Sequence, residues 1–119
     1  MSCRLAVPAF EPGIHTSPYT LLRLLASARP PLVVDLRPPT HSPRRTLSGS
    51  VAWRGGVWPF GDRQAVLVDE HGDHRTEEWV QRLKRAGHHQ VRTLYGGLAL
   101  YDHALDPLVV GDQRYLVLC

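Results

Sequence analysis

The chain has 119 residues, which is enough for one domain with one hydrophobic core and too few for two. Hydrophobic residues make up 43% of it and charged residues 21%, so its composition is that of a globular protein and argues against disorder. The net charge of +3 is scattered, and the basic clusters at residues 44–45 and 82–85 lack interleaved aromatic residues, so we expect no nucleic-acid binding.

The N-terminal third predicts two strands and one helix. Residues 5–7 favour a short first strand. A helix is expected to start near His15, because the Thr-Ser pair at 16–17 supplies an N-cap, Pro18 suits the first helical position, and four leucines follow at helical spacing. The apolar run 32–34, which leads into Asp35, is typical of a strand buried on both faces of a parallel sheet.

The middle of the chain is dominated by a long irregular segment. Residues 37–64 are rich in Pro, Gly, Ser and Arg, which predicts a loop with one short strand near Val51. The apolar run 65–68 then predicts a second buried strand, and Asp69 follows it directly.

The next elements alternate between helix and strand. A helix is predicted over residues 76–86, because Thr76 can cap it and Gly87 can end it in the left-handed conformation. A third strand is predicted over 91–94, followed by a Gly-Gly turn and a short helix over 98–104.

The tail, residues 107–119, reads as a hairpin extension of a domain that covers residues 1–106. Its two apolar runs, 108–110 and 115–118, flank a polar turn. We expect this hairpin to cover a sheet edge or to pair with a second chain, because an uncovered apolar edge invites aggregation. A monomer and a homodimer both remain open.

Alternation of strands with helices indicates βαβ units with right-handed crossovers. The expected fold is therefore a three-layer α/β domain with a largely parallel central sheet flanked by helices. Ligands in such folds sit beyond the carboxyl ends of the strands, which directs attention to Asp35 and to the loop that starts at Asp69.

Features that would place the chain outside the cytoplasm are missing from the sequence. Two cysteines, Cys3 and Cys119, are too few for a disulfide framework. The first residues lack the apolar core of a signal peptide, and no run approaches the ~18 apolar residues of a membrane span. We expect a cytoplasmic protein that does not bind membranes.

The loop between the second buried strand and its helix predicts an anion-binding site. A tight turn there directs successive backbone N–H groups toward one point, and the helix dipole adds to their effect. Gly72 tolerates positive φ, and Arg75 offers a planar fork for an oxyanion. The candidate site residues are Asp69, Glu70, His71, Gly72, Asp73, His74 and Arg75.

Two other interpretations of this loop stay open. It can be a solvated connection with no ligand. Its two histidines and two carboxylates, at residues 69, 71, 73 and 74, also have the chemistry of metal ligands, but their spacing matches no established pattern. We therefore expect no metal.

The chain carries, in order, VVDLR at 33–37, LSGS at 47–50, VLVD at 66–69 and a closing segment at 83–97. In sequence and spacing these four segments resemble the rhodanese superfamily over residues 15–103. VVDLR at 33–37 looks like the first signature, and LSGS at 47–50 falls where the family has Ile-Pro-Gly-Ala. VLVD at 66–69 falls where a strand ends in the active-site cysteine, and residues 83–97 match the closing signature. The resemblance implies a rhodanese-like fold whose structural motif residues are Asp35, Arg37, Gly49, Gly96 and Gly97.

The departures from the family concern function. Asp69 replaces the cysteine whose thiolate carries the transferred sulfur as a persulfide, which a carboxylate cannot do. His41 replaces an acidic partner of the arginine that matches Arg37, and Thr46 and Ser48 replace the usual His and Pro. Five residues separate positions 69 and 75, as in related phosphatases and arsenate reductases, but their nucleophile is missing too.

These observations predict a catalytically inactive rhodanese-like module with a binding or regulatory role, for which a link to sulfur handling is one hypothesis. Its expected ligand is a protein partner or a small anion, and we expect no cofactor. The alternative is a weak sulfurtransferase or phosphatase-related enzyme that uses residues other than a loop cysteine, such as Cys119.

Overall fold

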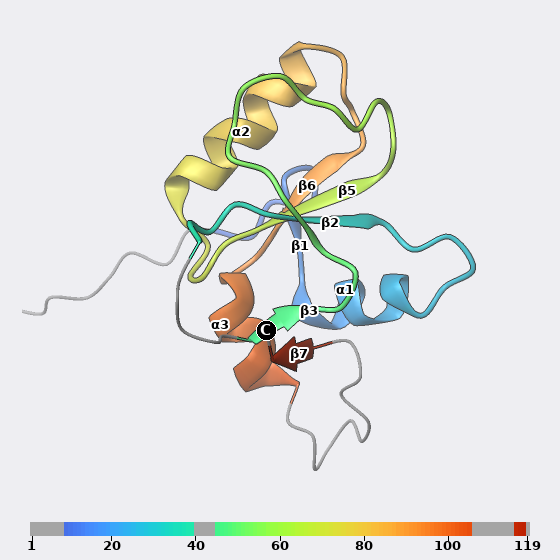
Figure 1. The fold of residues 1–119 in the computed structure, drawn as a ribbon, viewed down its shortest axis with the longest axis vertical. Coiled ribbons are helices and arrows are strands. Elements are labelled where there is room, and N and C mark those ends of the chain that lie inside the picture. Colours follow the sequence, from blue (N-terminus) through green and yellow to red (C-terminus); the bar gives the residue numbers. More distant parts are fainter. Residues whose placement is uncertain (1–8, 40–44, 106–115, 119) are drawn as a thin grey trace, which may run out of the picture.

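The structure, a computed structural model, describes residues 9–39, 45–105 and 116–118 (Figure 1). A sheet lies between α2 (His74–Arg85) on one face and α1 (Pro18–Leu25) and α3 (Gly97–Ala104) on the other (Figure 1). The predicted α/β arrangement, with helices on both faces of a parallel sheet, is confirmed. In the part of the chain that is described, no helix is long and apolar enough to cross a membrane.

The main sheet has five strands in the order β1-β6-β5-β2-β4, and every neighbouring pair is parallel. A separate two-stranded sheet is formed by β3 and β7, which are antiparallel. The strand bounds are β1 His15–Thr16, β2 Leu32–Asp35, β3 Arg45–Leu47, β4 Val51–Ala52, β5 Ala65–Val68, β6 Val91–Leu94 and β7 Leu116–Leu118.

The central strand β5 contributes to the core on both of its faces. Val66 and Val68 belong to the cluster on the side of α1 and α3, whereas Ala65 and Leu67 belong to the cluster on the side of α2. All four are at most 2% exposed, as expected for a strand covered on both faces. Of the predicted core residues, Leu32 is half-buried, and the others are buried: Val33, Val34, Val66, Leu67, Val68, Val91 and Leu94.

The helix starts show one correct and one wrong prediction. Ser17 caps α1 by accepting the Thr20 N–H at 3.2 Å, and Pro18 is the first helical residue, as expected. The predicted cap Thr76 is wrong, because α2 already begins at His74. Asp73 caps α2 instead, since its extended backbone lets its carboxylate accept the Arg75 N–H at 2.9 Å.

Two short strands were not predicted. His15–Thr16, expected at the start of a helix, forms β1 and pairs with Thr93–Leu94 of β6. Arg45–Leu47, expected within a loop, forms β3 and pairs with β7. Neither segment stands in an apolar run that would predict a strand, so only the distant pairing partner identifies it.

Parts of the expected tail and N-terminus cannot be compared with the structure. The predicted strand at residues 5–7 and the first strand of the hairpin, 108–110, lie outside the described residues. The second run of the hairpin contains β7, whose observed partner is β3.

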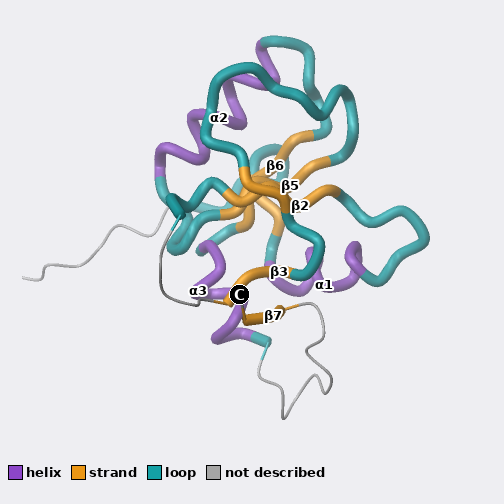
Figure 2. The backbone as a smooth tube through the Cα atoms, viewed as in Figure 1, coloured by secondary structure: helices purple, strands orange, loops and turns teal. Residues whose placement is uncertain are grey.

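The connection from β4 to β5 crosses the α2 side of the sheet as a loop rather than a helix (Figure 2). Aromatic side chains fill the space beneath it. The Trp53 ring lies 4.9 Å from Trp79 of α2 and 5.0 Å from Trp58, measured between centroids, and Trp58 lies 4.8 Å from Phe60. These edge-to-face contacts fix the loop against α2.

Shortening one buried side chain of the central strand tests whether the core packs on both faces of the sheet. Leu67 is fully buried, so Leu67→Ala should lower the free energy of unfolding by about 2–5 kcal/mol, because it leaves a cavity in a packed interior. Val57 is 89% exposed, so the matched control Val57→Ala should change it by less than about 0.5 kcal/mol. Urea unfolding measures both, and equal effects would contradict the described core.

Candidate functional site

Asp69 lies directly after β5, at the carboxyl edge of the sheet, and is 7% exposed. One carboxylate oxygen accepts the Gly72 N–H at 2.6 Å. The other accepts the Asp73 N–H at 2.5 Å and the Thr76 hydroxyl at 2.6 Å. Asp69 therefore accepts hydrogen bonds from the loop N–H groups and from one hydroxyl of the following helix.

This geometry explains why Thr76 does not cap α2. Thr76 is buried in the first turn of the helix, and its hydroxyl donates to Asp69 rather than accepting from the helix amides. The sequence analysis did not identify this contact. Its signal is the placement of a threonine in the first turn of a helix that follows a strand-end carboxylate.

Arg37 is buried next to Asp69 between two acidic residues. Its Nε and Nη2 donate to the Asp35 carboxylate at 3.1 and 2.9 Å, and its Nη1 donates to Glu70 at 3.0 Å. Nη2 also donates to the Arg45 carbonyl at 3.1 Å, which ties β2 to β3. A planar guanidinium can satisfy all these acceptors at once, whereas an ammonium cannot.

The electrostatics of this group favour the charged form of Arg37. Burial alone would lower the pKa of Arg37, but the hydrogen bonds and charges of Asp35 and Glu70 outweigh burial and raise the pKa above its ordinary value. His41, which stands where the family has an acidic partner, lies outside the described residues. Within the described residues, Asp35 and Glu70 are the acidic partners of Arg37.

The start of α3 clamps the loop from the opposite side. The Leu98 and Ala99 N–H groups donate to the Asp69 and Glu70 carbonyls, both at 2.8 Å. Gly97 has φ +69°, and a Cβ there would lie 2.6 Å from the Glu70 carbonyl and from the Gly72 nitrogen. Only glycine permits this approach of two backbone segments.

The predicted site residues do not all converge. Asp35, Arg37, Gly96 and Gly97 lie around the start of the loop, but Gly49 lies apart from them, in the turn after β3. His71, Asp73, His74 and Arg75 are exposed, and the Glu70 side chain is 52% exposed. Among the described residues, no group of three His, Cys, Asp or Glu side chains could hold a metal ion.

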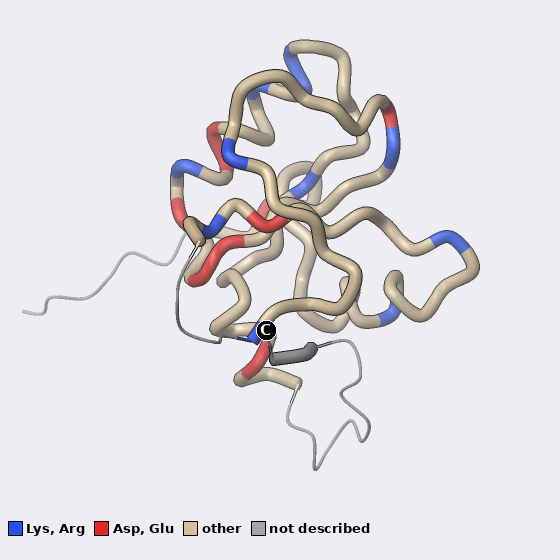
Figure 3. The backbone as a smooth tube through the Cα atoms, in the orientation of Figure 1, with Lys and Arg blue, Asp and Glu red and all other residues tan. Residues whose placement is uncertain are grey.

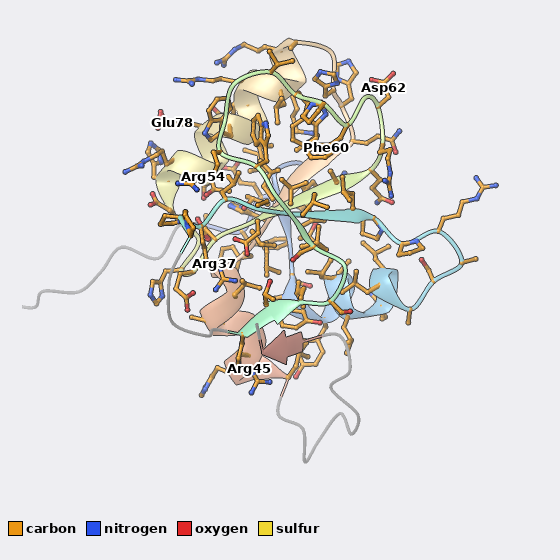
Figure 4. The ribbon with its side chains drawn as sticks, in the orientation of Figure 1. Arg37, Arg45, Arg54, Phe60, Asp62 and Glu78 are labelled. Atoms are coloured by element: carbon orange, nitrogen blue, oxygen red, sulfur yellow. The ribbon has the colours of Figure 1, made fainter. Side chains whose placement is uncertain are left out.

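A hollow of about 450 Å³ opens beside the loop, and we refer to it as the loop hollow. Figure 4 shows Arg54 and Arg37 on this side of the molecule, close to the start of α2, and Figure 3 shows acidic and basic residues gathered there. Its lining consists of Leu36, Arg37, Pro38, Trp53, Arg54, Asp69, Glu70, His71, Asp73, Arg75, Thr76 and Trp79. The sequence analysis did not connect Trp53, Arg54 or Trp79 with the loop, because they come from other elements.

Comparisons with known proteins identify no relative of this chain. No family model matches it, and no curated protein or solved structure gives a significant match.

The first prediction for the site concerns the two aspartates of the loop. Asp69→Ala leaves two N–H groups and a buried hydroxyl without their acceptor, so it should lower the free energy of unfolding by about 3 kcal/mol. Asp73→Ala removes only a helix cap and should cost about 1 kcal/mol. Urea unfolding compares the two variants. If Asp69→Ala lowered the free energy of unfolding no more than Asp73→Ala does, this role of Asp69 would be contradicted.

The second prediction concerns the close approach at Gly97. Gly97→Ala and Gly49→Ala both place a side chain at positive φ, which costs roughly 1–2 kcal/mol. A Cβ at Gly49 meets nothing within 4 Å, whereas one at Gly97 overlaps the loop backbone. Thermal unfolding should show that Gly97→Ala lowers the free energy of unfolding by about 1–3 kcal/mol more than Gly49→Ala does, because overpacking adds to the backbone strain. Equal losses would mean that the loop can move away from α3.

Proposed function

We propose that this chain is a rhodanese-like module that does not transfer sulfur and acts by binding. One observation carries the proposal: the carboxylate of Asp69 occupies the loop and accepts hydrogen bonds from Gly72, Asp73 and Thr76. Sulfur transfer requires a thiolate at this place, and the carboxylate supplies none.

The positions of the motif segments support the relationship to the rhodanese superfamily. Asp35 ends β2, Asp69 follows the central strand β5, and Gly96 and Gly97 begin α3. These segments are far apart in the sequence, yet they meet at the carboxyl edge of one parallel sheet, where Arg37 links Asp35 to Glu70. A parallel sheet commonly binds its ligands at this edge.

The occupied loop also determines where a ligand can bind. The N–H groups of Gly72 and Asp73 are bonded to Asp69, so an incoming anion cannot use them. The loop hollow beside them is open, and no cysteine or serine is among the described residues that line it. We therefore place the ligand, a small anion or a group on a protein partner, in the loop hollow rather than inside the loop.

Restoring a cysteine tests this proposal. Asp69→Cys, in a background with Cys3→Ser and Cys119→Ser, places a thiol beside two N–H groups and the start of α2, so its pKa should fall below the ordinary value of about 8.5. Iodoacetamide should then alkylate it faster near neutral pH than the exposed control Ser48→Cys. Equal rates would show that the loop is not an anion-stabilising structure.

A turnover assay addresses the enzymatic alternative. The wild-type chain should show no thiosulfate:cyanide sulfurtransferase activity, and Asp69→Cys should show at most a slight gain, because His41 and Thr46 also depart from the family. Clear wild-type turnover would refute the proposed function. If Cys119→Ser abolished that turnover, the terminal thiol would be the sulfur carrier.

A further inference from the structure

We propose that the loop hollow binds a small aromatic molecule that carries an oxyanion, with its anion on Arg54 and Arg75 and its ring against Trp53 and Trp79. The inference rests on the proposed binding function and specifies the ligand for that site. It follows from the two free cations, the apolar wall and the size of the hollow, each of which is independent of the family resemblance.

The first observation is that the arginines of the loop hollow differ in their acidic partners. Arg37 is neutralised by Asp35 and Glu70. The side chains of Arg54 and Arg75 are exposed, and neither forms a hydrogen bond or an ion pair with another described residue. Two guanidinium groups at one hollow, with no ion-pair partner in the described part of the chain, favour an oxyanion, to which a planar fork can donate two hydrogen bonds.

Three acidic residues also line the loop hollow, and none of them forms an ion pair with Arg54 or Arg75. Both oxygens of Asp69 accept hydrogen bonds, and Glu70 pairs with Arg37. Asp73 accepts the backbone N–H of Arg75, which leaves the guanidinium of that residue unengaged. The lining holds three carboxylates and three guanidinium groups, so an anion depends on direct hydrogen bonds from Arg54 and Arg75 rather than on a net positive charge.

The second observation excludes a bare inorganic anion as the preferred ligand. An anion held only by exposed guanidinium groups gains little, because solvent and salt screen the attraction. Four apolar side chains also line the loop hollow: Leu36, Pro38, Trp53 and Trp79. Trp53 is only 6% exposed, so a ligand that covers this wall removes mainly the surface of Leu36, Pro38 and Trp79 from water. Flat rings pack well on tryptophan.

The third observation concerns size. The volume of about 450 Å³ lies in the range of small-molecule sites, and the hollow has both an apolar wall and a few polar groups. These properties fit a single aromatic ring with an attached phosphate or carboxylate.

Titration with four probes tests this inference: phenyl phosphate, benzoate, phenol and inorganic phosphate. Binding is followed by NMR shifts of the indole N–H signals of Trp53 and Trp79. Phenyl phosphate and benzoate should bind at least ten times more tightly than phenol or inorganic phosphate, and added salt should weaken their binding. Binding of inorganic phosphate as tight as that of phenyl phosphate would overturn the role of the apolar wall.

Charge variants locate the anion. Arg54→Gln and Arg75→Gln should each weaken the binding of phenyl phosphate at least fivefold. Arg85 is exposed at the far end of α2, so Arg85→Gln should leave this affinity unchanged. Glu70→Gln removes the negative charge that neutralises Arg37 and should strengthen binding about threefold. Equal effects of Arg75→Gln and Arg85→Gln would show that only net charge matters and would overturn the assignment.

The two proposals fail in different ways. If no probe binds while the wild-type chain also lacks sulfurtransferase activity, the ligand assignment is wrong and the inactive module remains. If the wild-type chain transfers sulfur, the proposed function is wrong whatever the probes show.

Discussion

The carboxylate of Asp69 is the interaction on which the loop depends. It accepts two backbone N–H groups and one hydroxyl within eight residues of the chain, and it does so at the point where β5 turns into α2. A chain that turns this sharply has to satisfy amides that no strand or helix can pair. Here a side chain of the loop itself satisfies them, so the turn does not need a bound anion.

Two further contacts hold this turn in place. Arg37 joins Asp35 at the end of β2 to Glu70 of the loop, and the start of α3 donates to the Asp69 and Glu70 carbonyls. Gly97 makes the second contact possible, because any side chain there would overlap the loop backbone. The carboxyl edge of the sheet is therefore a rigid base, and the loop hollow opens beside it.

The same contacts shape our view of function. A thiolate in the place of Asp69 would be stabilised by these N–H groups and available to a substrate, whereas the carboxylate is already fully engaged. In our proposal, recognition moves from the loop to the neighbouring hollow, which Arg54, Arg75 and the two tryptophans line. In this proposal, the carboxylate that stabilises the turn also takes the place that a sulfur-carrying thiolate would need.

The sequence by itself determined the strands at 32–35, 65–68 and 91–94 and the place of Asp69 at a strand end. The first two contain unbroken apolar runs, which report burial on both faces. Only the tertiary structure decided the two short strands, the pairing of Arg37 with Glu70 and the meeting of Trp53 with Trp79. The last two contacts join residues 26 or more positions apart, and no local pattern records them. Thr76 shows the limit most clearly: its sequence context favours a cap, but the buried carboxylate beside it is the stronger partner.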